Sequence, residues 1–72
     1  MTASAAEHAA TLENDARIVK ECGARLAGVL AGMGDDAPTW LRELVDAHRA
    51  ACEVASGDLA AAARRLRRLA EG

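Results

Sequence analysis

The 72-residue sequence has little of what usually fills a protein core. Trp40 is the single aromatic residue, and Pro38 is the single proline. Nineteen residues are alanine, so the large apolar side chains make only a thin core for a monomer of this length. Small domains usually compensate with a disulfide, a metal or a partner chain. We therefore expect one helical domain over residues 1–72 that self-associates.

The sequence also lacks the features of exported and membrane proteins. Residues 1–14 contain no basic segment followed by a continuous apolar segment, as a signal peptide would. No stretch approaches the roughly 18 apolar residues of a membrane span. The net charge of −2 gives no overall attraction to nucleic acid or to an anionic membrane. We expect a cytoplasmic protein that binds no membrane, and its eight arginines and single lysine suggest a bacterial source of high GC content.

No catalytic pattern is present either. There is no Ser-His-Asp pattern, and the glycine-containing segment GMGDDAP at 32–38 lacks the lysine and the preceding strand of a nucleotide-binding loop. The sequence therefore predicts a protein that is not an enzyme and that binds another protein, as an adaptor or as a regulatory or accessory subunit.

The N-terminal half predicts one long helix from about residue 4 to about residue 32. Ser4 followed by Glu7 fits a capping box, in which each side chain satisfies a free backbone N–H of the first turn. An apolar stripe then recurs every three or four residues, which is typical of a helix packed along one face. We predict that this stripe continues into an interface at Leu12, Val19, Leu26, Leu30, Met33 and Trp40.

A turn should follow this helix. Gly32 and Gly34 can adopt the left-handed conformation that ends helices. Asp36 is the expected N-cap of a second helix over 38–56, with the proline tolerated in its first turn.

The segment SGD predicts a second interruption. Gly57 would end the second helix, and Asp58 would cap a third helix over 58–70. Short connections favour antiparallel neighbours. The expected fold is thus an all-α three-helix bundle: one long N-terminal helix and a shorter C-terminal hairpin, most plausibly forming an antiparallel dimer.

Three residues suggest a second function. His48 and Cys52 are one helical turn apart, and Cys22 is expected at a similar height on the neighbouring helix. Both cysteines could be small buried residues, or they could form a disulfide that closes a loop of about 30 residues. Thiolate and imidazole groups also suit tetrahedral zinc, so a zinc or thiol-redox sensor using Cys22, His48 and Cys52 is the alternative hypothesis.

Two further features each have two interpretations. Arg64, Arg65, Arg67 and Arg68 form a basic patch that would bind nucleic acid or an acidic partner, or would simply be the solvated face of the last helix. Trp40 is either an interface anchor or a cap on the end of the hairpin core.

Overall fold

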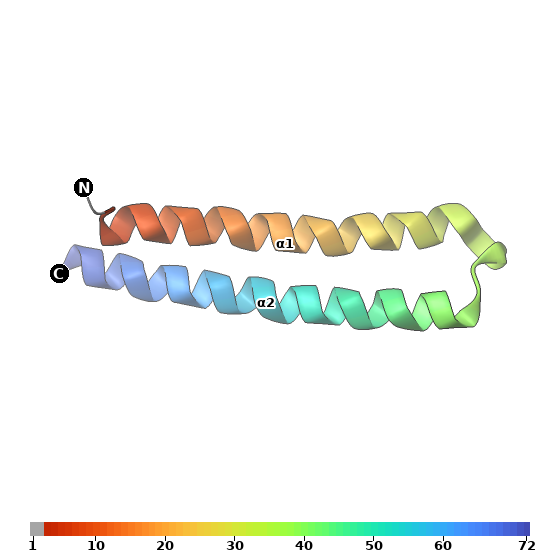
Figure 1. Ribbon diagram of the computed structural model, residues 1–72. Helices are drawn as coiled ribbons and strands as arrows, with labels where there is room; N and C mark the ends of the chain where they lie inside the picture. The colour runs from red at the N-terminus through yellow and green to blue at the C-terminus, as the bar shows by residue number, and fades with distance from the viewer. Residues whose placement is uncertain (1–2) are drawn as a thin grey trace.

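The computed structural model describes residues 3–72, which form a single helical hairpin (Figure 1). Helix α1 spans Ala5–Met33, a short 3-10 turn η1 spans Gly34–Asp36, and helix α2 spans Thr39–Glu71. The two helices run antiparallel along a body of 53 × 17 × 16 Å, so both ends of the chain lie at the same end of the hairpin. The all-α prediction is confirmed, and residues 3–72 contain no strand.

Helix α1 begins and ends within one residue of its predicted limits. The Ser4 side chain accepts a hydrogen bond from the Glu7 N–H at 3.1 Å, which confirms Ser4 as the N-cap. At the other end Gly34 has a φ of 58°, and its N–H donates to the Leu30 carbonyl. A residue with a Cβ would be strained in that conformation, so a glycine at this position ends the helix sharply.

Helix α2 begins at Thr39, one residue after its predicted start, but its N-cap differs from the prediction. Asp36, the expected N-cap, lies within η1 instead, and the Pro38 carbonyl accepts the first hydrogen bonds from the N–H groups of Leu41 and Arg42. The cause is steric, because a proline pushes the preceding residue into extended backbone. Ala37 accordingly has a ψ of 122°, and the helix starts only after the proline.

The predicted third helix is wrong as a separate element. Helix α2 continues without a break through Ser56, Gly57 and Asp58. A glycine inside a helix costs only about 1 kcal/mol relative to alanine. The Ser56 hydroxyl, expected at a helix end, donates to the Ala16 carbonyl at 2.8 Å and links α2 to α1 at this height. Residues 3–72 therefore form two long helices and not one long and two shorter ones.

Small residues form the contact between the two helices. The buried residues of α1 are Ala9, Ala16 and Gly23, and those of α2 are Val45, Cys52 and Ala63. A Cβ added to Gly23 would lie 3.2 Å from the Cys52 Cβ, so the two backbones approach closely at this point. No large side chain of the described chain is fully buried. The hairpin is closely packed but encloses almost none of its large apolar side chains.

Candidate interaction surface

One long side of the hairpin is polar. We call it the polar edge and define it by Glu13, Lys20, Arg49, Glu53 and Arg67. Shallow grooves run along it, and their lining residues come from both helices: Lys20, Gly23 and Ala24 of α1, and Arg49, Cys52, Glu53, Ser56, Gly57 and Ala60 of α2. These shared grooves show that the named charged residues of α1 and α2 lie on the same side of the helix pair.

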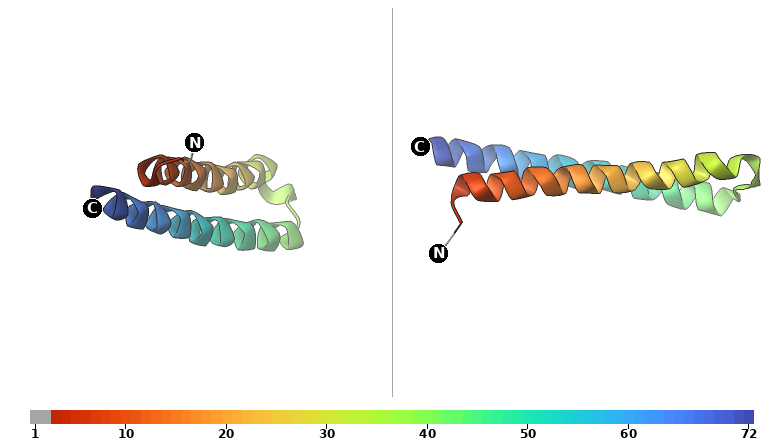
Figure 2. Two further views of the ribbon diagram at one scale, coloured as in Figure 1. Left: turned by 60° about the vertical axis from the view of Figure 1, so that its left-hand side comes forward. Right: turned by 90° about the horizontal axis from the view of Figure 1, so that it is seen from above.

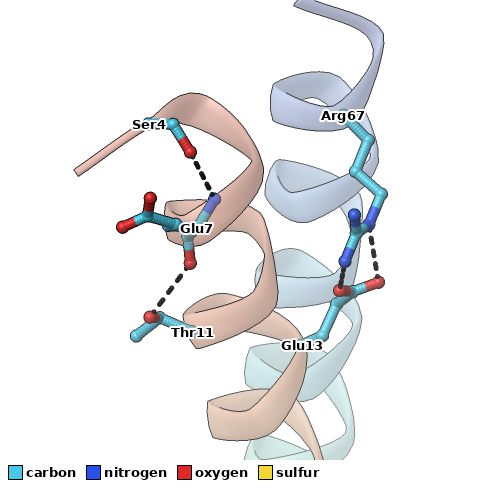
Figure 3. A network of polar contacts seen from close by, with 5 residues as sticks. All are labelled: Ser4, Glu7, Thr11, Glu13 and Arg67. Atoms are coloured by element: carbon cyan, nitrogen blue, oxygen red, sulfur yellow. Dashed lines mark hydrogen bonds and ion pairs between the residues drawn. The ribbon is translucent and has the colours of Figure 1, made fainter. Parts of the chain in front are cut away.

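An ion pair closes this edge near the chain ends. Arg67 donates to both carboxylate oxygens of Glu13, with 3.1 Å between Nε and Oε2 (Figure 3). The hydrogen bond from Arg67 lowers the pKa of Glu13, and the same bond raises the pKa of Arg67. Both side chains are about half exposed, so water and salt weaken the pair. It is the single ion pair within residues 3–72.

The opposite side of the hairpin carries most of the exposed large apolar residues. Successive residues of a helix are turned by about 100°. On α1 this places Lys20 on one side of the buried stripe and Ile18 and Val29 on the other; on α2 it separates Arg49 from Leu44 in the same way. Since the two charged residues share the polar edge, the two apolar stripes share the other side. We call this side the apolar face and define it by six exposed residues: Ile18, Val29, Met33, Trp40, Leu44 and Leu69.

Two residues of this face are highly exposed. Trp40 is 65% exposed and Leu44 is 60% exposed, so most of the surface of each residue is in contact with water. Val54 is equally exposed at 66%, and helical periodicity turns it by about 80° from Leu44 toward the back of α2. Val54 therefore serves as a comparison residue outside this face. The six others recur along one side of the hairpin, and by the same periodicity Arg25 lies between Ile18 and Val29 on α1.

The structure divides the predicted interface residues into two groups. Leu12, Val19, Leu26 and Leu30 are half-buried on the stripe of α1 that faces α2, so the hairpin itself uses part of their surface. Met33 and Trp40 remain exposed on the apolar face. The role of Trp40 as an interface anchor stays a prediction.

The Cys22, His48 and Cys52 set is only partly brought together. The Cys52 Sγ lies 3.3 Å from the His48 Nε2, and Cys52 is buried. Cys22 is exposed, because its neighbour Gly23 occupies the position opposite Cys52. Both thiols are free, and within residues 3–72 no three His, Cys, Asp or Glu side chains converge as a metal site would require.

The basic patch is spread around the end of α2. Arg64, Arg65, Arg67 and Arg68 are all exposed, and Arg67 is engaged with Glu13. The binding of nucleic acid or of an acidic partner by this patch stays a prediction.

Sequence reasoning missed most of the apolar face. Ile18 and Val29 are 11 residues apart, which is close to three full turns, and this spacing is the signal that they share a stripe. Leu44 and Leu69 of α2 belong to the same surface once α2 is one continuous helix.

Comparisons of the chain with protein-family models, with curated proteins and with solved structures give no match. Neither of the helices between residues 3 and 72 has a segment long and apolar enough to cross a bilayer.

Proposed function

We propose that this chain is a small non-catalytic protein–protein interaction module, an adaptor or a regulatory or accessory subunit, and that it forms a homodimer through its apolar face. The observation that carries the proposal is the row of six exposed large apolar side chains along one side of the hairpin. Burial of apolar surface is the main favourable free-energy contribution to protein association, and these six side chains would supply it when a partner covers them.

The total surface supports this proposal. The hairpin exposes 5298 Å², whereas a compact folded monomer of its mass exposes about 4,250 Å². The excess is about 1,000 Å², and each partner of a typical stable complex buries about 800 Å². The radius of gyration of 16.4 Å also exceeds the value of about 11 Å for a compact domain of this length. A partner on the apolar face would bring both quantities toward the ordinary range.

The geometry favours a second copy of the chain as this partner. Each helix carries two apolar stripes about a quarter turn apart, one facing the other helix and one on the apolar face. Helices of a four-helix bundle need this pattern, because each of them packs against two neighbours. A second hairpin supplies two more helices with the same spacing.

The test compares two substitutions of equally exposed residues. Leu44→Glu places a charge in the apolar face, and Val54→Glu places the same charge on the back of α2. Sedimentation equilibrium should show a wild-type dimer at micromolar concentration, a dimer for Val54→Glu, and a dissociation constant at least about 100-fold higher for Leu44→Glu, because burying an unpaired charge costs several kcal/mol. A monomeric wild type, or equal effects of the two substitutions, would contradict the proposal.

A second candidate function is metal or thiol-redox sensing, and the contact between His48 and Cys52 favours it. Two ligands on one helical turn form half of a zinc site. Zinc titration of the reduced chain followed by native mass spectrometry should then show bound zinc that is lost in Cys52→Ser. Cys22→Ser is the informative companion, because the hypothesis that Cys22 is a ligand requires the same loss. A wild-type chain that binds no zinc in this titration would contradict the metal-sensing function.

A further inference from the structure

We infer that the two copies pack with their turns at the same end, so that α1 of each copy lies on α2 of the other. The inference rests on the proposed homodimer and assigns its arrangement. Two-fold symmetry allows two ways of placing one apolar face on another. In one, the axis runs along the helices and both turns meet. In the other, the axis runs across the helices and the turns lie at opposite ends.

The apolar face is uneven along its length, and this decides between the two arrangements. Near the turn both helices expose large apolar residues on this side, Val29 and Met33 on α1 and Trp40 and Leu44 on α2, with Arg25 beside them on α1. Near the chain ends, helical periodicity places Glu7, Thr11 and Asp15 on the α1 part of the same side. All three of these polar side chains are exposed.

With the turns at opposite ends, α1 would pack on α1 of the partner. Val29 and Met33 would then lie over the segment of the partner that carries Glu7 and Thr11. Such a contact places polar side chains over Val29 and Met33, so it buries little apolar surface against apolar surface. The exposed apolar groups near the turn would gain little from this contact.

With the turns at the same end, α1 packs on α2 of the partner. Val29 and Met33 then meet Leu44 and Trp40, so the apolar half of each face covers the apolar half of the other. At the chain ends, the segment of α1 with Glu7 and Asp15 meets the part of α2 that carries Arg65, whereas Arg67 is paired with Glu13 on the polar edge. Both apolar contact and charge complementarity therefore favour this arrangement.

A distance between the two turns tests the inference. A nitroxide label on Asp35→Cys, in a chain that also carries Cys22→Ser and Cys52→Ala, reports this distance by pulsed electron paramagnetic resonance. Sedimentation equilibrium on the labelled sample establishes that it is a dimer. We expect a label-to-label distance well below half of the 53 Å long axis. The same label with Leu44→Glu added is the control, and it should lose the dipolar signal.

The possible results separate a failure of the proposed arrangement from a failure of the proposed homodimer. A dimer whose labels are separated by nearly the full length of the hairpin overturns the inference and leaves the homodimer intact. A wild-type chain that is monomeric overturns both. If the substitutions at the two cysteines alone prevent association, carboxylate cross-linking of the wild-type chain, with one copy labelled with heavy nitrogen, decides instead. Links between the two Asp35 residues support the inference, and links from Asp35 to Glu7 of the other copy overturn it.

Discussion

The two long sides of the hairpin are built from the same two helices, yet they differ in their contacts. On the polar edge, side chains of the two helices contact each other, whereas on the apolar face large side chains remain exposed. The polar edge is held by the Glu13–Arg67 pair and by the hydrogen bond from Ser56 to Ala16, and the smallest residues of the contact lie toward it. The half-buried leucines of the contact lie toward the apolar face instead. The view from above in Figure 2 shows that the two helices cross each other as they run along the hairpin.

The difference follows from side-chain size. Where alanine and glycine face the other helix, the backbones approach, and one hairpin can satisfy that contact alone. Large side chains cannot fit between backbones that are this close, so they are displaced to the other side of the contact. A single pair of helices has nothing with which to cover them. The close approach of the backbones on the polar edge is thus the reason why large apolar side chains are exposed on the apolar face.

Widening the close contact should have the largest effect. Gly23→Val places a branched side chain against the Cys52 Cβ, which already lies 3.2 Å from the position that a Cβ at residue 23 would occupy. The helices must separate, and overpacking of this kind costs about 1–3 kcal/mol. Urea denaturation followed by circular dichroism measures the loss. Gly28→Val is the matched control, because nothing lies within 4 Å of a Cβ at Gly28. Equal stability of the two variants would refute the close contact.

The next largest expected effect is a gain in stability, and it tests whether α2 is one continuous helix. Gly57 lines a groove of the polar edge, and a Cβ there would meet nothing within 4 Å. Gly57→Ala should stabilise the chain by up to about 1 kcal/mol, because alanine has the higher helix propensity. If Gly57 ended a helix in the left-handed conformation, the same substitution would be destabilising. Thermal unfolding therefore distinguishes one long helix from two short ones by the direction of the change.

Residue patterns were sufficient for the parts of the fold that local chemistry decides. The Ser4 cap, the left-handed Gly34 and the regular apolar spacing between them predict α1 within one residue. Gly57 was misleading because a helix end and a tolerated interior glycine have the same local sequence. The choice depends on contacts with α1, such as the bond from Ser56 to Ala16, which residue spacing alone does not reveal.

The candidate surface was harder to predict for a related reason. Each helix has two apolar stripes, and residue spacing does not indicate which of them faces the other helix. The stripe with Ala9, Ala16 and Gly23 forms the contact because small residues allow the closest approach. The predicted interface therefore left out Ile18 and Val29, although both are exposed on the second stripe of α1.

The smallest expected effect comes from the ion pair that closes the polar edge. Because Arg67 lowers the pKa of Glu13 in the folded chain, this pair stabilises the fold fully above the ordinary Glu value of 4.5. The stabilisation is lost as the pH falls through the lower pKa of the folded state. Glu13→Gln should therefore reduce the melting temperature slightly at neutral pH and low salt, and this difference from wild type should shrink in acid and in high salt. Glu21→Gln removes an exposed carboxylate of α1 that has no ion-pair partner within residues 3–72 and is the control. A difference that persists unchanged into acid would show that Glu13 stabilises this edge by packing and not by its charge.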